Sequence, residues 1–176
     1  MLNLVIAPAD VLLQMARPVE KVDDSVRELM DGMFRVMYEN HGIGLAANQV
    51  GVLKRVIVVD VEHDRDKDEN IINKKQYFMA NPEVLSHSDA KSSLAEGCLS
   101  FPGERVEIER PTSIKVKFVD YDGNPQEIEA TGLLATCIQH EIDHLNGVSI
   151  SNYVSHLKRD MMFSRLRKYK KRIAFV

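Results

Sequence analysis

The chemistry that this sequence could support is clearest in the segment His140-Glu141-Ile142-Asp143-His144. Side chains four residues apart lie on the same face of an α-helix, so His140 and His144 can direct imidazole nitrogens at one metal ion. Glu141 lies beside them, where its carboxylate can hold a water molecule bound to that metal. The alternative is a surface helix with two histidines. The helix expected here, from about 133 to 145, is apolar around most of its circumference, which predicts an interior position where histidines need partners.

A catalytic metal site normally takes three protein ligands and leaves one position for water. Two common sources of a third ligand are missing. The position six residues after His144, where one class of zinc protease has a third histidine, is Ile150. Another class takes a downstream glutamate, but Glu141 is the last glutamate of the chain. His156 and Asp160 remain downstream, at the start of a basic helix. Upstream, the thiol of Cys98 is a further candidate, because a thiolate is a strong metal ligand.

Cys98 lies in the segment Glu96-Gly97-Cys98-Leu99-Ser100, where Gly97 permits a close approach of the backbone. A buried structural thiol is the usual role of a lone cysteine. That role fits Cys137 better, since Cys137 precedes His140 by one turn on the same helix face.

The periodicity predicts three helices. Ser25 and Glu28 have the spacing of a capping box, and apolar residues follow at helical spacing until about His41-Gly42, where glycine is expected in the cap. The second helix is the one that carries the histidines, and the third runs from about 155 to 171.

Between the first and second helices the pattern predicts β-strands. A β-branched run covers 55–60, and the segments 105–109 and 113–119 alternate as half-buried strands do. The turn Tyr121-Asp122-Gly123-Asn124-Pro125 joins 113–119 to 126–130 as a hairpin. The fold class expected is α+β, with antiparallel β-sheets around a central metal-binding helix, an N-terminal helix and a C-terminal helix.

The segment Glu62 to Lys75 carries dense alternating charge and interrupts the strands. Asp64, Asp66 and Asp68 resemble the first ligands of a calcium-binding loop, but Glu69 replaces its glycine and Lys75 its final glutamate. We expect a solvated loop without a calcium site.

Composition excludes several classes of protein. The chain has 176 residues, of which 44% are hydrophobic and 28% charged, so it suits one globular domain over 1–176 rather than a disordered or fibrous protein. No apolar run approaches the ~20 residues of a membrane-spanning helix, and the N-terminus does not have the pattern of a signal peptide. Two cysteines are too few for a disulfide framework and suggest reduced thiols in the cytoplasm.

The net charge of -3 is unevenly distributed. From Lys158 to Arg172 there are eight basic residues against Asp160 alone, which gives this segment +7 and leaves -10 on the first 157 residues. A solvated helix that maintains solubility is one interpretation. A cationic surface that binds RNA is the other.

Three segments together resemble the bacterial peptide deformylases, namely Gly42-Ile43-Gly44-Leu45-Ala46-Ala47-Asn48-Gln49, Glu96-Gly97-Cys98-Leu99-Ser100 and Gln139-His140-Glu141-Ile142-Asp143-His144. Their order and separations are similar to that family over nearly the whole chain. The resemblance implies removal of the formyl group from N-formylmethionine on nascent polypeptides. It also implies Fe(II) as the usual metal, with zinc or nickel able to substitute, and a C-terminal helix, over 155–172, that docks on the ribosome.

The resemblance assigns roles to the catalytic residues. It implies three metal ligands: Cys98, His140 and His144. A water on that metal would lose its proton to Glu141 and attack the formyl carbon. Glu141 would then pass the proton to the departing amine. The Gln49 amide and the backbone N–H of Leu99 would stabilise the oxyanion, together with the metal.

The resemblance also implies a pocket for the methionine side chain, formed by Ile43, Gly44, Leu133 and Cys137 beside the first histidine. Glycine at 42 and 44 could let a peptide backbone approach as an added strand, or could serve only to end the first helix. Glu96 and Arg105 would lie near the entrance. Alternatively, Glu96 could position a metal ligand, and Arg105 could be a solvated strand residue.

Two further functions compete with this one. A zincin-type peptidase would use the same metal and glutamate, but the downstream ligand that it needs is missing. An RNA- or ribosome-binding module with a structural metal would need a fourth protein ligand, and no second cysteine is suitably placed.

Overall fold

The structure, a computed structural model, describes residues 2–174. Its α-helices are α1 (Asp24–Glu39), α2 (Gly132–Leu145) and α3 (His156–Ile173), and its short 3₁₀ helices are Asp10–Leu13, Ala47–Val50 and Ile150–Tyr153. The strands are β1 (Gly44–Ala46), β2 (Val56–Val59), β3 (Asp64–Arg65), β4 (Ile71–Ile72), β5 (Tyr77–His87), β6 (Lys91–Gly97), β7 (Arg105–Pro111), β8 (Ser113–Val119) and β9 (Pro125–Thr131).

The strands form one sheet and two hairpins. The sheet has five strands in the order β1-β2-β5-β8-β9, while β6 pairs with β7 and β3 with β4, and every pairing is antiparallel. The predicted 113–119 hairpin is confirmed, since β8 pairs with β9 from Ser113 opposite Thr131 to Val119 opposite Pro125. The α+β fold class expected from the sequence is confirmed.

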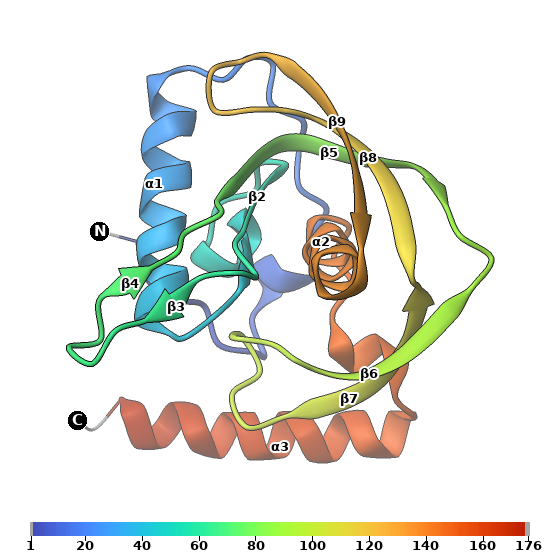
Figure 1. Ribbon diagram of the computed structural model, residues 1–176. Coiled ribbons are helices and arrows are strands. Elements are labelled where there is room, and N and C mark those ends of the chain that lie inside the picture. The colour runs from blue at the N-terminus through green and yellow to red at the C-terminus, as the bar shows by residue number, and fades with distance from the viewer. Residues whose placement is uncertain (1, 175–176) are drawn as a thin grey trace.

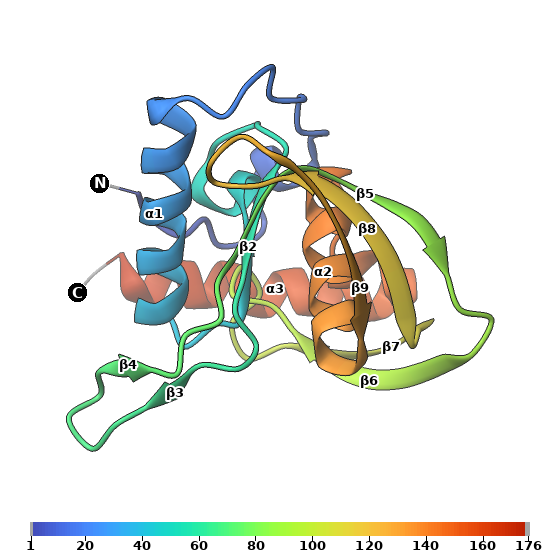
Figure 2. The same ribbon diagram turned by 45° about the horizontal axis from the view of Figure 1, so that its top comes forward.

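Helix α2 lies inside the fold, between the large sheet and the β6–β7 hairpin (Figures 1 and 2). Helix α1 packs beside β2, and α3 runs along the bottom of the molecule in the view of Figure 1. Side chains of α2 pack on Ile57 and Val59 of β2 and on Val116 of β8, all of them fully buried. This packing holds the histidine-bearing helix rigidly at the centre. Within residues 2–174, no helix combines the length and hydropathy that crossing a membrane requires.

The start of α1 differs from the prediction. The N-cap is Asp23, not Ser25, because the Asp23 carboxylate accepts a hydrogen bond from the backbone N–H of Val26 at 3.1 Å. Ser25 instead donates its hydroxyl to the same carboxylate at 2.6 Å. Both residue types cap helices well, so the local pattern alone could not separate them.

The end of α1 also differs from the prediction, since the left-handed residue that follows the helix is His41, with φ of 57°, and not a glycine. Gly42 has another role. A Cβ at Gly42 would lie 2.6 Å from Cδ1 of Leu99. The chain leaving α1 therefore passes close to the Leu99 side chain, in the turn that contains Cys98, and a side chain at position 42 would displace it.

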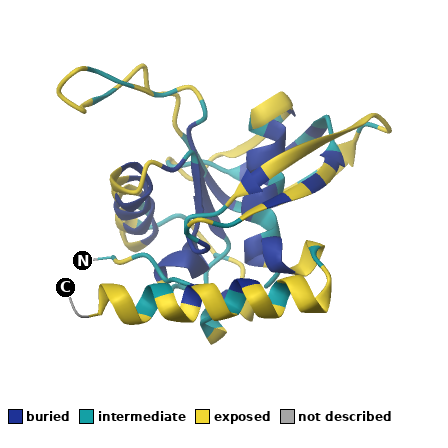
Figure 3. Cartoon of the chain, turned by 90° about the horizontal axis from the view of Figure 1, so that it is seen from below, coloured by how far each residue is buried: buried dark blue, intermediate teal, exposed yellow. Residues whose placement is uncertain are grey.

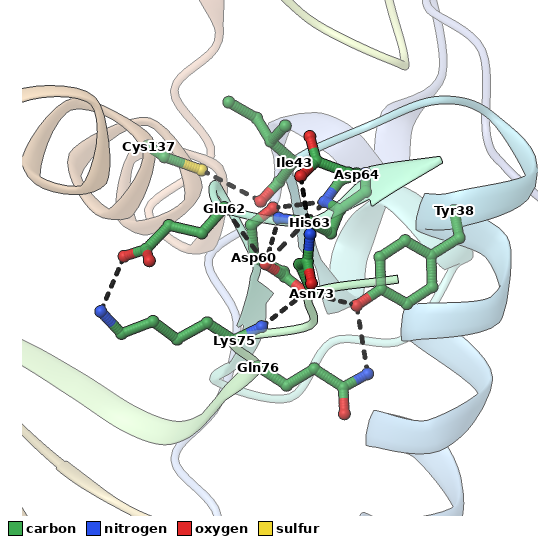
Figure 4. Close-up of polar contacts among 10 residues, drawn as sticks. All are labelled: Tyr38, Ile43, Asp60, Glu62, His63, Asp64, Asn73, Lys75, Gln76 and Cys137. Atoms are coloured by element: carbon green, nitrogen blue, oxygen red, sulfur yellow. Dashed lines mark hydrogen bonds and ion pairs between the residues drawn. The ribbon is translucent and has the colours of Figure 1, made fainter. Parts of the chain in front are cut away.

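The charged segment from 62 to 75 was expected to be a loop and is instead a hairpin, built on β3 and β4, that projects from the body (Figures 1 and 2). Its base is held by Asp60, whose side chain is fully buried (Figure 4). The Asp60 carboxylate accepts hydrogen bonds from the Tyr38 hydroxyl at 2.7 Å and from the backbone N–H groups of His63 and Lys75 at 3.0 and 3.2 Å. These bonds order the segment where it leaves the protein.

Helix α3 begins at His156, close to its predicted start, and most of its surface is exposed (Figure 3). Met162 and Leu166 are its buried residues. They pack in one cluster with Leu12 of the N-terminal segment and with Phe101, which lies three residues after Cys98. The helix is therefore docked along one stripe, and its basic residues surround that stripe.

Candidate metal centre and active site

The two histidines of α2 face the same side of the helix, one turn apart, as their spacing predicts. Their ring centroids are 5.0 Å apart, and His140 and His144 are only 8% and 0% exposed. Burial lowers the pKa of His144 well below its ordinary value, so its imidazole is neutral, the form that binds metals. The helix thus presents two imidazoles to the interior instead of to solvent.

Cys98 is brought to these histidines by the turn that follows β6. The backbone carbonyl of Cys98 accepts a hydrogen bond from Phe101 N at 2.9 Å, which closes the turn, and Sγ lies 3.2 Å from Nε2 of His144. One potential ligand atom from each of Cys98, His140 and His144 lies within 4.8 Å of the other two. His156 and Asp160 are not part of this group among residues 2–174.

The residues present fit a divalent metal. A thiol and two imidazoles are the donor set that zinc and iron accept, and three protein donors leave an open position. The pKa of His140 lies well above its ordinary value: burial acts to lower it, but hydrogen bonding to Cys98 and Glu96 outweighs that effect. Without a metal, this environment holds a proton on His140, and a bound cation would displace that proton.

His140 is oriented by a buried network of charged side chains. Its Nδ1 lies 2.8 Å from Oε2 of Glu96, which leaves Nε2 for a metal. Glu96 also pairs with Arg110, through Nε to Oε1 at 2.5 Å and Nη2 to Oε2 at 3.0 Å, and Arg110 Nη1 reaches Asp143 at 2.9 Å. Burial acts to raise the pKa of Glu96, but its bonds to His140 and Arg110 outweigh this and lower it.

Sequence reasoning missed Arg110, which is only 6% exposed. The signal was present in the strand pattern. In β7 the buried positions alternate with exposed ones, so that Arg110 continues the inward face of Val106 and Ile108. The predicted strand stopped at Glu109, one residue short. An arginine in the buried phase of a strand requires a buried acid, here Glu96.

Glu141 is buried in the same cavity. Its Oε2 has no hydrogen-bond partner among the described residues, and burial raises its pKa to about 7. Gly44 of β1 lies against this carboxylate, since a Cβ there would be 2.6 Å from Glu141 Oε1 and 2.5 Å from Cys137 Sγ. The glycine thus allows β1 to pack directly on α2.

The thiol of Cys137 lies 3.5 Å from the carbonyl oxygen of Ile43, and burial raises the pKa of this thiol well above its ordinary value.

Gln49 reaches the centre from the short helix that follows β1. Its Oε1 accepts a hydrogen bond from Ala46 N at 2.8 Å, which fixes the amide and turns Nε2 toward Ser100 Oγ at 3.2 Å and Cys98 Sγ at 3.5 Å. The backbone N–H of Leu99 has no protein acceptor within the described part of the chain. Ser100, fully buried, was not predicted.

A cavity of about 750 Å³ opens beside this centre. The predicted residues that line it are Ile43, Gly44, Gln49, Glu96, Cys98, Leu99, Arg105, Leu133, Cys137, His140 and Glu141. Leu133 is 48% exposed and lies at the margin of the cavity, and Arg105 donates to the carbonyl of Ala95 at 3.2 Å. The fold therefore gathers the predicted residues from β1, the turn after β6, β7 and α2 at one site.

Comparison with known proteins decides the family. A sequence model described as polypeptide deformylase matches residues 1–160. Relatives include the peptide deformylases of Rhizobium meliloti (strain 1021), 47% identical over 94% of this chain and 91% of the relative, and of Rickettsia akari (strain Hartford), 45% identical over 98% of both. The chain belongs to the peptide deformylase family.

Solved deformylase structures share this fold throughout. The enzyme from Ehrlichia chaffeensis is 41% identical, with a TM-score of 0.88 over 100% of this chain and 99% of that one. The enzyme from Legionella pneumophila is 38% identical, with a TM-score of 0.86 over 99% and 98%. This chain is accordingly a metal-dependent hydrolase that removes the N-terminal formyl group of nascent polypeptides. The peptidase and RNA-binding alternatives do not hold against it.

Proposed function

We propose that this deformylase releases formate from N-formylmethionyl chains through Glu141, Gln49 and Leu99, acting beside a metal held by Cys98, His140 and His144. The observation that carries the proposal is the position of the Cys98 thiol, next to both histidines of α2. It lies in the same cavity as a buried oxygen of Glu141 that has no hydrogen-bond partner in the described part of the chain.

The metal we propose is Fe(II), with zinc or nickel able to replace it. One thiolate and two imidazoles suit all three ions. When bound, the ion supplies a Lewis acid that activates water and polarises the formyl carbonyl. The protein contributes the geometry, because Glu96 orients His140 from behind and Arg110 holds Glu96 in turn.

Glu141 acts as the proton carrier in this proposal. Its free Oε2 takes a proton from the water that attacks the formyl carbon, and then delivers that proton to the amine as the carbon–nitrogen bond breaks. A pKa of about 7, raised by burial, suits both transfers at neutral pH. The products are formate and a free amino terminus.

Gln49 and Leu99 stabilise the oxyanion in this proposal. The amide of Gln49 is held through its oxygen, so its nitrogen is already directed toward Cys98. The N–H of Leu99 follows the proposed ligand in the chain and has no acceptor among residues 2–174, so it can donate to the substrate. Donors fixed in this way contribute about 10²- to 10³-fold each in comparable sites.

The methionine side chain is proposed to occupy the apolar part of the cavity, near Ile43, Gly44, Leu133 and Cys137. Arg105 lines the same cavity and is proposed to lie beside the bound peptide. Glu96 was expected near the entrance. Its bonds to Arg110 and His140 favour the alternative role, in which it positions a metal ligand.

A substrate comparison tests this function. Purified, metal-replete protein should release formate from formyl-Met-Ala-Ser under anaerobic conditions, and a chelator should abolish that release. The unformylated and N-acetylated peptides are the controls, and neither should be cleaved at comparable rates. Cleavage of internal peptide bonds with the formyl group left intact would refute the proposal.

Metal analysis of variants tests the ligand set. Cys98→Ala, His140→Ala and His144→Ala should each lose the metal. Cys137→Ala is the matched control, a second cysteine in the same cavity, and should retain it. Glu141→Ala should bind metal but lose nearly all turnover, because only the proton carrier is removed. A full metal content in Cys98→Ala is incompatible with the assignment.

We also propose a cytoplasmic enzyme, built as one catalytic domain over 1–176, that docks on the bacterial ribosome through α3. The substrate supports docking, since formylated termini appear where chains leave the ribosome. The exposed basic residues of α3 support it as well, because an otherwise acidic protein needs such a surface to bind RNA.

A further inference from the structure

The active-site cavity has a second wall whose side chains have no part in the roles above. One wall comes from α2 and from the segment that enters β1, and includes Cys137 and Ile43. The other comes from the N-terminal segment, the turn after β6, and α3, and its apolar and aromatic side chains are Leu4, Ile6, Leu99, Phe101 and Tyr169. Among the described residues, Tyr169 is the side chain that α3 contributes to the cavity.

Tyr169 is held toward the cavity by contacts on both sides of it in α3. One turn earlier, Arg165 forms a bidentate pair with Glu104, Nε to Oε1 at 2.6 Å and Nη2 to Oε2 at 2.7 Å. Glu104 lines the cavity as well. Lys170 donates from Nζ to the carbonyl of Pro8 at 3.0 Å. The guanidinium of Arg172 lies 5.5 Å from the centre of the Tyr169 ring.

The interior packing of α3 fixes the same orientation. Met162 and Leu166 are 3% and 1% exposed, and they pack in one cluster with Phe101, the second-wall residue that follows the Cys98 turn. Phe163 adds an aromatic contact to Phe101, with ring centroids 6.3 Å apart. Because α3 is fastened at these points, Tyr169 forms a fixed part of the wall.

We propose that Tyr169 contacts the residues that follow formylmethionine in the substrate, so that α3 takes part in substrate selection. The proposal rests on the proposed function, since it requires the formyl group to lie at the Cys98, His140 and His144 centre. The cavity, at about 750 Å³, is within the ~300–1,000 Å³ range of sites that enclose whole small ligands. Methionine against the α2 wall leaves the α3 wall for the continuing chain.

The chemistry of the second wall defines what it selects. An aromatic ring with leucine, isoleucine and phenylalanine beside it favours apolar side chains over polar ones, because burial of apolar surface provides the attraction. A tyrosine ring also offers a large contact area at a small cost in conformational entropy. We therefore expect a preference for apolar residues among the two or three positions after the methionine.

Kinetics on three substrates test the proposal, namely formyl-Met-Ala, formyl-Met-Ala-Ser-Ser and formyl-Met-Ala-Leu-Leu. The wild-type enzyme should prefer the leucine peptide to the serine peptide. Tyr169→Ala should lower kcat/KM for the leucine peptide by about 2- to 10-fold, the size of one lost aromatic contact, mainly through KM. Its kcat/KM for formyl-Met-Ala, which ends one residue after the methionine, should fall less than that for the leucine peptide.

Lys168→Ala is the matched control, since Lys168 is the neighbouring residue of α3 and is exposed. It should behave as wild type on all three peptides. An equal loss on short and long peptides in Tyr169→Ala would indicate a structural role and overturn the proposal, as would no loss at all. A wild-type enzyme that releases no formate from any peptide would instead mark the failure of the proposed function.

Photolabelling provides a second test that does not depend on the folding of the tyrosine variant. The probe is formyl-Met-Ala-benzoylphenylalanine, bound to the metal-loaded Glu141→Ala protein and irradiated. We expect mass spectrometry to find the label on Tyr169 or on a neighbouring residue of α3. Label confined to α2 and β1 would overturn the proposal.

Discussion

Arg110 shows how one buried residue can support a metal site without touching the metal. Its guanidinium pairs with the carboxylates of Glu96 and Asp143. Glu96 contacts His140, and Asp143 directly precedes His144 in α2. Taking charges into a protein interior is costly, and removing one partner leaves the other buried and unpaired. The network therefore holds His140 in place only while all of its members are present.

Arg110→Met tests this dependence. It should lower the free energy of unfolding by about 3–5 kcal/mol, measured by urea denaturation of the metal-free protein, because Glu96 is left without its cation. Metal affinity should fall by about 10- to 100-fold in a chelator competition. Lys115→Met is the control, as its ion pair with Glu127 is largely exposed and should contribute under about 1 kcal/mol. Equal effects of the two variants would contradict the assignment.

Gly44 has a steric role that the sequence motif did not reveal. Gly44→Ala would place a methyl group 2.6 Å from Glu141 Oε1, so the carboxylate must move. We expect a fall in kcat with metal content retained, measured by formate release and metal analysis. Gly32→Ala is the control and should keep full activity, because its Cβ meets only the end of the flexible Leu2 side chain. Unchanged kcat in Gly44→Ala would show that the strand shifts freely.

At the scale of elements, the buried carboxylate of Asp60 connects the projecting hairpin to both α1 and β1. Besides the three donors to its side chain described above, the backbone N–H of Asp60 donates to the carbonyl of Ile43 at 2.9 Å. Tyr38 gains a second bond from Gln76 at 3.2 Å (Figure 4). The base of the hairpin is thus part of the structure that fixes the start of β1.

Asp60→Asn should destabilise the protein by about 1–3 kcal/mol, since the new amide places N–H donors against existing ones. Thermal unfolding measures the change, and hydrogen exchange should show faster opening of the amides of His63 and Lys75. Asp64→Asn, a change of the same kind on an exposed residue of the hairpin, should have almost no effect. If both variants melt alike, the carboxylate does not anchor the hairpin.

The elements that sequence reasoning predicted well are those whose signal is local. The apolar circumference and histidine spacing of α2 were sufficient, and so was the turn between β8 and β9. What it missed has two causes. Asp23 and Ser25 are both good caps, so the local pattern could not choose between them. The contacts of Gly42 with Leu99 and of Arg110 with Glu96 join segments far apart in the chain, so although the alternation of β7 could mark Arg110 as buried, it could not name its partner.

For the molecule as a whole, α3 combines two surfaces. Its inner stripe belongs to the core and to the cavity wall, through Leu166 and Tyr169, while its outer face carries exposed basic residues such as Lys158, Arg167, Lys168 and Lys171. Deleting the helix would disturb both surfaces at once. Substitutions confined to the outer face separate the proposed ribosome docking from folding and catalysis.

The triple variant Arg167→Gln, Lys168→Gln, Lys171→Gln should bind ribosomes more weakly than wild type, with hydrolysis of formyl-Met-Ala-Ser unchanged. Each phosphate contact contributes about 0.9 to the slope of log affinity against log salt on duplex nucleic acid, so the variant should show a shallower salt dependence. Co-sedimentation with purified ribosomes over a series of salt concentrations measures both quantities.

A variant with the same change in charge elsewhere distinguishes a docking surface from a general effect of net charge. Lys91→Gln, Lys115→Gln, Lys117→Gln removes three lysines that pair with glutamates on the sheets. If the +7 segment of α3 is the docking element, this control should bind ribosomes as wild type does, because potentials decay within about 10 Å at 0.1 M salt and only a local cluster acts on RNA. Equal losses in the two triple variants would mean that α3 has no special part in binding, while the deformylase activity would stand.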